Sequence, residues 1–532
     1  MNRKLLVPAA MVGLIAPALA GCGGSNGGSG GNGDAIVVGT TDNFTATKDA
    51  EAPLDPAAAY DIGAWNILRN TFQTLLNYPR TGTDPVPDAA EKCSFTDQLG
   101  ETYRCSLRPG LQFSNGDQLT SADVKFSVER SLAIKDRNGP SSLLENIDKV
   151  ETPTANTVVF HLKSPDATFP FKLATPAAAI VDSKVYPADK IYAGYKVVGS
   201  GPYALNSFAP DDKAEFVRNQ KYKGFAKVNN DKIELRFFKD SDAMEKALRG
   251  GSIDLMNRTM TSEQIAKFMD STSQSLNLVQ AAGSEIRYLV FNVNDPSVKS
   301  LAVRKAVAQV VDRQALVRDV YARTAEPLYS MVPQGITGHT NSFFNIYGDP
   351  SVSAARATLQ KAGISTPVPL SMTYTTDHYG AATAKEFAEL KRQLEETGLF
   401  QVSIQGVPWS SFRPAMQQGK YQVYGMGWFP DYPDPDTYIG PFFGKDNFLG
   451  SVYHNDAIEK QLLPRTRQDA TRSFTVNNFS QMQDDIARDI PFLPLWQGKQ
   501  YLVAKSQITG TEWALNSASE LSYWELGRGV KN

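Results

Sequence analysis

One stretch of this chain strongly restricts the conformations that its backbone can adopt. It is residues 425–438, Gly-Met-Gly-Trp-Phe-Pro-Asp-Tyr-Pro-Asp-Pro-Asp-Thr-Tyr. The apolar run Tyr421–Trp428 leads into it and predicts a strand. Three prolines then follow within six residues, at 430, 433 and 435. Because proline cannot donate a hydrogen bond to a strand ladder, we expect the strand to end there and the chain to leave the sheet.

The same stretch places aromatic rings beside carboxylates. The rings are Trp428, Phe429, Tyr432 and Tyr438, and the carboxylates are Asp431, Asp434 and Asp436. Aromatic walls around a carboxylate suit an organic cation with an apolar body. The alternative is an Asp/Pro turn packed by core aromatics.

The segment before this stretch alternates helices and strands. Phe387, Leu390 and Leu394 share one face of a helix predicted over Glu386–Gly398. A strand at Val402–Val407, a helix at Ser410–Gln418 and the strand at Tyr421–Trp428 follow it. This βαβ unit predicts a parallel or mixed sheet. Ligands of such sheets lie beyond the carboxyl ends of the strands, which is where residues 425–438 begin.

The N-terminus has the pattern of an export signal. Arg3 and Lys4 precede an apolar run, Leu5–Ala20, which is short for a membrane span. Leu19-Ala20-Gly21-Cys22 resembles a bacterial lipobox, in which the signal (residues 1–21) is removed and Cys22 carries the lipid. The alternative is a free or buried Cys22 behind an ordinary signal. Residues 22–33 are a Gly/Ser/Asn tether without core-forming side chains.

Composition describes an ordinary globular protein. The 532-residue chain is too long for one core, and its formal charge of −2 comes without any basic run, so we expect no nucleic-acid partner. No second apolar segment approaches membrane length, so only the lipid would touch the bilayer. The four histidines show no metal-ligand spacing, and no phosphate-binding loop is present. We therefore expect no metal and no cofactor.

Two further cysteines fit an oxidising compartment. A turn at 97–101, centred near Leu99, would place Phe95 opposite Tyr103 and Cys93 opposite Cys105. A disulfide across that hairpin is our prediction, with two separate buried thiols as the alternative.

Five motifs occur in order along the chain. The longest is Leu107–Val124, Leu-Arg-Pro-Gly-Leu-Gln-Phe-Ser-Asn-Gly-Asp-Gln-Leu-Thr-Ser-Ala-Asp-Val. The others are Val198–Tyr203, Gly250–Asp254, Tyr288–Asp312 and Trp428–Pro435. Together they resemble the extracytoplasmic solute-binding proteins of family 5, which serve peptide and nickel ABC importers. Trp428–Pro435 matches that family's Trp-x-x-Asp-Tyr-x-(Asp/Glu)-Pro pattern, which lines the ligand cleft.

This resemblance implies an α/β fold of the periplasmic-binding-protein type II, with two α/β lobes joined by a hinge plus an extra domain. Domain I would comprise residues 34–76, 181–283 and 497–532. Domain II would be residues 77–180, and domain III residues 284–496. Crossings near Gly283 and Gln497 would form the hinge, and ligand binding would close domain I on domain III.

The family's ligand contacts carry over to few positions. Asp431 would take a peptide's α-ammonium, Trp428 would wall the cleft, and the backbone of Gly427–Phe429 would pair with an extended peptide. The domain I loop after Leu54-Asp55-Pro56 would contribute three more residues, Tyr60, Asp61 and Ile62. No arginine near a signature presents itself for a ligand carboxylate, so ligand length stays open.

The function implied is peptide capture outside the membrane. We expect a monomeric, lipid-anchored binding protein on the outer face of the bacterial cytoplasmic membrane (the periplasmic side). It would deliver di- or oligopeptides to the permease and ATPase subunits of an ABC importer. Family relatives also bind nickel chelates, sugars, opines and haem, so a non-peptide ligand is the alternative. The rival outside the family is an exported hydrolase with Asp431 and Asp434 as paired carboxylates.

Overall fold

The computed structural model describes residues 35–529 except 43, 45, 47–50, 272–274, 381, 446, 448–450, 517 and 519. The expected signal, the lipid-bearing Cys22 and the tether lie outside these residues. Within the described part of the chain, no helix is both long enough and apolar enough to cross a bilayer.

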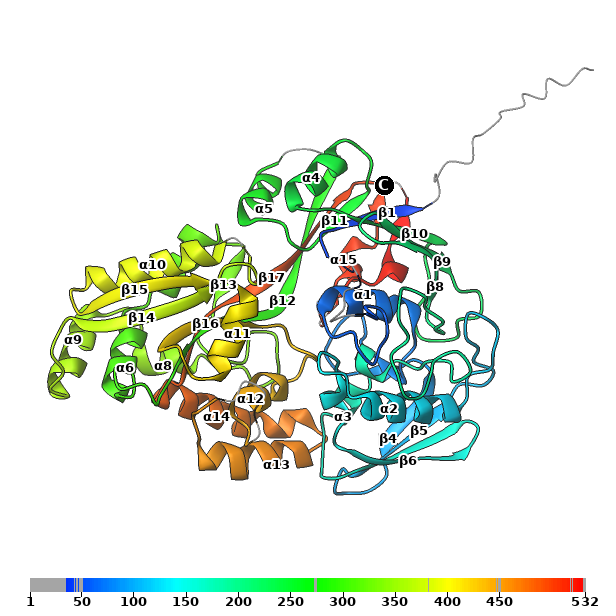
Figure 1. Cartoon of the computed structure of the whole chain (residues 1–532), viewed down its shortest axis with the longest axis horizontal. Helices are drawn as coiled ribbons and strands as arrows, with labels where there is room; N and C mark the ends of the chain where they lie inside the picture. The colour runs from blue at the N-terminus through cyan, green and yellow to red at the C-terminus, as the bar shows by residue number, and fades with distance from the viewer. Residues whose placement is uncertain are drawn as a thin grey trace, which may run out of the picture. The chain divides into compact units, whose positions relative to one another are not determined.

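A mixed sheet of 11 strands organises the described residues (Figure 1). Its strand order is β15-β14-β16-β12-β17-β11-β1-β10-β9-β8, with β13 paired to β17. In that order the strands are β15 (Phe400–Val407), β14 (Val368–Thr375), β16 (Val423–Trp428), β12 (Leu276–Phe291), β17 (Phe492–Lys505), β11 (Leu255–Asn257), β1 (Ile36–Thr40), β10 (Lys232–Phe237), β9 (Lys213–Arg218), β8 (Tyr203–Ala209) and, off the path, β13 (Ala325–Pro327).

The βαβ prediction is confirmed. β14 lies parallel to both β15 and β16. The helices of this unit, α10 (Ala382–Glu396) and α11 (Trp409–Gln417), form within a few residues of the predicted ranges. Phe387, Leu390 and Leu394 are fully buried, as their shared face predicts.

Two large hydrophobic cores flank the long strands β12 and β17, and a third, smaller cluster around Met244, Leu248 and Phe268 packs beside them. The first-lobe core is built from residues between Ile36 and Leu255 and between Leu502 and Leu526, joined by Tyr432. The second-lobe core is built from residues between Ile286 and Trp496. We use "first lobe" and "second lobe" for the parts around these two cores.

The strands β12 and β17 run through both lobes (Figure 1). Leu276–Ala282 pairs with Lys499–Lys505, Ile286–Val290 pairs with Phe492–Gln497, and the register shifts between Ala282 and Ile286. At this shift Gly283 approaches the other strand so closely that a Cβ would lie 2.2 Å from the Gly498 carbonyl oxygen. Only glycine allows that approach.

The first lobe also contains a four-stranded antiparallel sheet. It consists of β4 (Ala90–Phe95), β5 (Thr102–Leu107), β7 (Thr157–Leu162) and β6 (Ile147–Thr154). In the β4–β5 hairpin Phe95 faces Tyr103 and Cys93 faces Cys105, the register expected from the sequence. The two cysteines form a disulfide.

The remaining elements cover the sheets and connect the strands. First-lobe helices are α1 (Ile62–Thr71), α2 (Ser121–Ile134), α3 (Phe169–Lys172), α4 (Ser241–Arg249), α5 (Ser262–Met269) and α15 (Thr511–Ala514). Second-lobe helices are α6 (Leu301–Val310), α7 (Arg313–Ala315), α8 (Ser342–Tyr347), α9 (Val352–Lys361), α12 (Asp436–Phe443), α13 (Leu463–Gln468) and α14 (Val476–Asp489). Short strand pairs are β2 (Leu76–Asn77) with β3 (Val86–Pro87), and β18 (Ile508–Thr509) with β19 (Gly527–Arg528). Single turns of 3-10 or π-helix are η1 (Ser141–Leu143), η2 (Pro176–Ala178), η3 (Leu316–Val320), η4 (Ile458–Leu462), η5 (Arg472–Thr475) and η6 (Tyr523–Glu525).

The end of the chain completes the first lobe. The Leu521 amide donates to Asn66 Oδ1 (2.7 Å), and the Tyr523 amide donates to Asn70 Oδ1 (3.0 Å). Asn66 and Asn70 lie on α1, and Asn70 is fully buried. Tyr523, Trp524 and neighbouring apolar residues therefore belong to the same core as residues placed hundreds of positions earlier.

Candidate ligand-binding site

The end of β16 brings the two lobes into contact. The strand ends at Trp428, as the prolines predict, and the chain turns through Asp431 before α12 begins at Asp436. The Tyr60 hydroxyl, from the first lobe, donates a 2.7 Å hydrogen bond to Asp431 Oδ1. Burial, followed by the charge of Asp431, raises the pKa of Tyr60 well above its usual value, so Tyr60 is the proton donor.

Asp431 is a carboxylate without a full counter-charge. Burial raises its pKa to about 6, although the Tyr60 hydrogen bond and the charge of Lys172 act in the opposite direction. Within the described residues no ion pair joins it to an arginine or lysine. A half-buried carboxylate of this kind can accept hydrogen bonds from an ammonium group.

The next two aspartates of the segment are held differently. Arg472 donates to both oxygens of Asp434, at 2.6 and 2.8 Å. Arg467 donates to both oxygens of Asp436, at 2.8 and 3.0 Å. Both carboxylates are buried. Because Asp434 also accepts the Asp436 amide, its oxygens are committed to the fold, which leaves it poorly placed to act with Asp431 as a catalytic pair.

A cavity of about 480 Å³ lies where the lobes meet. The first lobe contributes Ile62 and residues 257–263, which run from the last residue of β11 into the first turn of α5. The second lobe contributes Phe429, Tyr379 and Arg287, among others, and the crossing strands contribute Gly283 and Gly498. Ile62 and Phe429 are thus predicted site residues that line this cavity. Phe429 is 39% exposed, so part of its ring is open to solvent at this cavity.

Arg287 is the residue that sequence reasoning missed. It lies on β12 with its guanidinium carbon 4.3 Å from the ring centre of Tyr379, 5.2 Å from Trp496 and 5.6 Å from Phe429. It forms an ion pair with Glu285. An arginine held between aromatic faces is a ready site for a ligand carboxylate. Its one sequence signal was a charge inside an otherwise apolar strand, Ile286–Phe291.

Gly427 has a structural reason to be glycine. It pairs with Arg287 across the β12–β16 ladder, and a Cβ there would lie 2.2 Å from Arg287 Nη1. The pairing between β14 and β16 stops at Thr373 and Tyr424. Among the described strands, none continues that ladder along residues 425–428, so this edge has room for an added strand. The Tyr379 hydroxyl contacts the Gly427 carbonyl there, at 3.3 Å.

A buried glutamate supports the cavity wall from behind. Glu386 Oε2 accepts hydrogen bonds from the Trp496 indole at 2.5 Å and the Tyr321 hydroxyl at 2.6 Å. Burial raises the pKa of Glu386, while these two hydrogen bonds oppose that shift. Trp496 and Tyr321 both line the cavity, so Glu386 fixes the orientation of two of its aromatic rings.

Two predicted residues have other visible partners. Asp61 caps α1, its side chain accepting the Ala64 amide at 2.9 Å. The Trp428 ring packs edge-on against Phe442, with ring centres 5.1 Å apart. These contacts give both residues a structural role, and their contact with a ligand stays a prediction.

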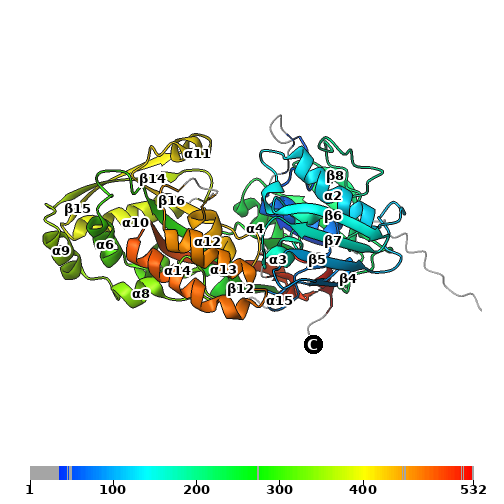
Figure 2. The ribbon, with the colours of Figure 1, turned by 90° about the horizontal axis from the view of Figure 1, so that it is seen from below.

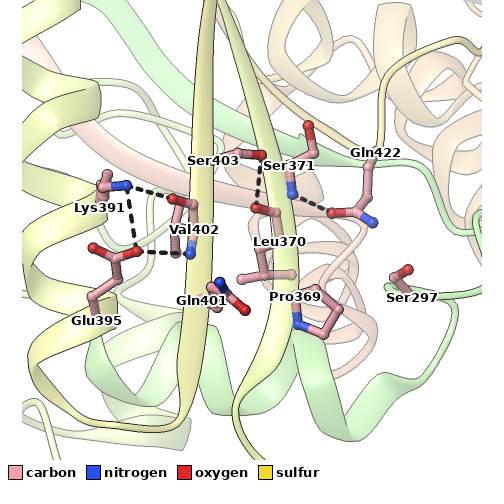
Figure 3. A pocket seen from close by; sticks show the side chains of 10 residues that line it. All are labelled: Ser297, Pro369, Leu370, Ser371, Lys391, Glu395, Gln401, Val402, Ser403 and Gln422. Atoms are coloured by element: carbon pink, nitrogen blue, oxygen red, sulfur yellow. Dashed lines mark hydrogen bonds and ion pairs between the residues drawn. The ribbon is translucent and has the colours of Figure 1, made fainter.

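A second hollow, of about 350 Å³, lies on β14 and β15 (Figure 3). Its polar groups bind one another. Lys391 Nζ donates to the Val402 carbonyl (2.7 Å), Glu395 accepts the Val402 amide (3.0 Å), and the Ser371 amide donates to Gln422 (2.6 Å). The second hollow therefore offers a ligand fewer unsatisfied groups than the cavity between the lobes.

The lobes also touch away from the cavity. The Ala167 amide, just before α3, donates to the Arg467 carbonyl on α13 at 2.7 Å. Figure 2 shows α3 facing α12, α13 and α14. The rings of Phe171 and Tyr432 meet there, 6.2 Å apart. The segment after β16 is therefore held from both lobes.

Two lobes on one continuous sheet, with a cavity at the strands that cross between them, define a type II binding protein. Residues 84–450 match the family model "Bacterial extracellular solute-binding proteins, family 5 Middle". The chain belongs to this family.

Similar proteins agree on this class. The chain is 24% identical to Di/tripeptide-binding protein 1 of Pseudomonas aeruginosa over 515 residues, 90% of this chain and 93% of that protein. It is 26% identical to the glutathione-binding protein GsiB of Salmonella paratyphi A over 489 residues, 89% and 91% of the two chains.

Solved structures share the fold. DppA of Helicobacter pylori, in complex with the peptide STSA, superposes with a TM-score of 0.76 at 20% identity, covering 93% of this chain and 98% of that one. AgaA of A. tumefaciens R10, in complex with agropinic acid, gives a TM-score of 0.75 at 21% identity, covering 94% and 99%. At these identities the likeness establishes the fold.

Proposed function

We propose that this protein is the substrate-binding component of an ABC importer and captures short peptides outside the membrane. The observation that carries the proposal is the cavity lined from both lobes at the crossing of β12 and β17, in a chain of the solute-binding family. Rotation about that crossing would enclose a ligand between the lobes, which is how hinged binding proteins trap their ligands.

Peptide is the favoured ligand because relatives along most of the chain's length carry peptide-binding names. Asp431 would hold the α-ammonium, assisted by Tyr60, and the open edge of β16 at Gly427–Phe429 would bind the peptide backbone. Delivery to the permease would follow from closure, and the lipid on Cys22 would keep the protein at the membrane face.

Ligand capture is tested by mass spectrometry of small molecules that co-purify with the protein from its native host. Calorimetry then compares a peptide with a free amino terminus and its N-acetylated form, on wild type and on Asp431→Asn. We expect the variant to lose about 100-fold or more in affinity for the free peptide and little for the acetylated one. Equal losses for both peptides would remove Asp431 from the ammonium site.

Binding without turnover separates this function from hydrolysis. The peptide should be recovered unchanged, and ligand at a hundredfold excess over Kd should stabilise the protein by about 2.7 kcal/mol. Cleavage of the peptide would favour a hydrolase. Membrane anchoring is tested by palmitate labelling of wild type and Cys22→Ala, and equal labelling would contradict it.

A further inference from the structure

The cavity contains an excess of basic side chains. Arg258, Arg287, Lys385 and Lys499 line it, against two acidic residues, Glu263 and Glu285. The pKa of His378, which also lines it, is lowered to about 4, first by burial and then by the charge of Arg287, so this histidine adds no charge at neutral pH. The lining therefore favours an anionic group on whatever enters.

Arg287 is the most deeply placed of these four cations. Its side chain is 8% exposed, against 18% for Lys499, 25% for Arg258 and 65% for Lys385. Lys499 and Arg258 pair with acids that do not line the cavity, namely Glu326 and Asp42. The partner of Arg287, by contrast, is Glu285, which itself faces the cavity.

Glu285 occupies an unusual place in the fold. It lies in the register shift of β12, between Ala282 and Ile286, where the ladder with β17 is interrupted. Its carboxylate lies over Gly498 of β17, since a Cβ built there would be 3.3 Å from Glu285 Oε2. A side chain in such an interruption is not fixed by ladder bonds of its own residue.

We propose that Glu285 occupies, in the unliganded protein, the place on Arg287 that a ligand's carboxylate takes. An incoming carboxylate then exchanges with Glu285, and the displaced side chain is released at the crossing of the two strands. The protein thereby selects ligands with an anionic end. The negative charge of the ligand would act on Glu285 and Arg287 at the crossing of β12 and β17, about which the lobes would rotate. This inference rests on the proposed function in taking a peptide as the first ligand to test.

The test compares carboxylate and amide forms of otherwise identical probes. The first pair is Ala-Phe-Ala with a free and with an amidated C-terminus. The second pair, which has no amine, is 3-phenylpropionate and 3-phenylpropanamide. Calorimetry or ligand-observed NMR measures each probe on wild type, Glu285→Gln, Arg287→Lys and a control, Asp319→Asn. The control removes an exposed carboxylate from Arg318, a pair outside the cavity lining.

On wild type, each carboxylate should bind at least about tenfold more tightly than its amide. Glu285→Gln removes the internal competitor, so it should strengthen carboxylate binding by about tenfold and change amide binding less than twofold. Arg287→Lys keeps the positive charge but loses the planar guanidinium that can bind a carboxylate through two hydrogen bonds. It should therefore reduce the ratio of carboxylate to amide affinity severalfold. Asp319→Asn should change neither, and thermal unfolding confirms that each variant is folded.

Equal binding of carboxylate and amide on wild type would overturn the inference. So would Glu285→Gln weakening both forms alike, since that is the behaviour of a purely structural ion pair. If neither tripeptide binds but 3-phenylpropionate does, and Glu285→Gln strengthens it, peptide capture fails while the exchange stands. If the tripeptides bind without regard to their C-terminal charge, the exchange fails while peptide capture stands.

Discussion

Three aspartates within six residues, between the end of β16 and the first residue of α12, have two different kinds of environment. Asp434 forms a bidentate ion pair with Arg472, and Asp436 forms one with Arg467. Asp431 accepts a hydrogen bond from a tyrosine hydroxyl of the opposite lobe. Burial raises the pKa of Asp431 to about 6 and also raises that of Asp434, but the charge of Arg472 is the main opposing influence at Asp434, whereas at Asp431 it is the Tyr60 hydrogen bond. The three side chains are chemically identical, whereas their surroundings separate two carboxylates paired with arginines from one that has no such partner among the described residues.

The difference shows what holds the segment after β16 in place. The Asp434–Arg472 and Asp436–Arg467 pairs fix the chain after β16 against η5 and α13, so that Asp431 can be presented with an incomplete complement of charge. A carboxylate kept short of partners costs stability, and sites that bind charged ligands commonly carry such a cost.

The largest effect should come from Asp434→Asn. Both members of its pair with Arg472 are buried, so the substitution leaves a guanidinium without its counter-charge, and we expect a loss of about 3–5 kcal/mol in the free energy of unfolding. Denaturant titration measures it. Asp431→Asn is the matched control. A loss below about 1 kcal/mol for Asp434→Asn would erase the distinction between the two environments.

In the protein without ligand, Asp431→Asn should change the free energy of unfolding in the opposite direction to Asp434→Asn. A carboxyl group whose pKa is raised by folding contributes stability at low pH that is lost as pH rises through its folded value, here about 6. The asparagine avoids this loss, so above pH 6 the variant should be more stable by up to about 3 kcal/mol. Unfolding titrations at pH 4.5 and 7.5 should show the gain growing with pH. A variant less stable than wild type at pH 7.5 would place Asp431 with the other two carboxylates.

Ligand binding should titrate with Asp431. A ligand ammonium requires the ionised carboxylate, so affinity for a free-amino peptide should fall about tenfold (1.4 kcal/mol) between pH 7 and pH 5. Calorimetry at several pH values measures this, and binding at pH 5.5 should release protons. The N-acetylated peptide and Asp431→Asn should both lack this dependence. A pH profile shared by all of them would point to another titrating group.

The smallest effect should come from Tyr60→Phe. The Tyr60 hydrogen bond holds the pKa of Asp431 below the value that burial alone would give. Its removal should move the midpoint of the pH dependence upward by less than about one unit. The double variant with Asp431→Asn should show no midpoint. A downward movement would mean that Tyr60 opposes the charge on Asp431 rather than supporting it.

Local pattern was sufficient for much of the fold. The βαβ unit around β14, β15 and β16 followed from helical and strand periodicity, and the β4–β5 register followed from a turn centred near Leu99. The family resemblance, through motifs in order, supplied the type II architecture. Each of these patterns lies within a short stretch of sequence, so it can be recognised without knowing which distant residues come together in the fold.

The candidate site could be predicted only in part from the sequence. Asp431 and Tyr60 were both expected near the ligand, and they are hydrogen-bonded across 371 positions of the chain. The resemblance singled out Asp431, but the pairing of Asp434 with Arg472 could not be predicted, because Arg472 lies in an unrelated segment. Arg287 was missed for the same reason, since its surroundings come from Tyr379, Phe429 and Trp496.

The closing segment of the chain has a consequence for the order of assembly. The buried Asn70 and its neighbour Asn66 accept hydrogen bonds from the amides of Tyr523 and Leu521, which are synthesised after the whole of the second lobe. The second lobe draws its core from one continuous stretch and can condense while synthesis continues. Synthesis of the first lobe therefore begins before that of the second lobe, but its folding can be completed only after the second lobe has been synthesised. A chain stopped short of Leu521 would leave α1 with unsatisfied amides and an open core, an easy target for proteases that remove incomplete molecules.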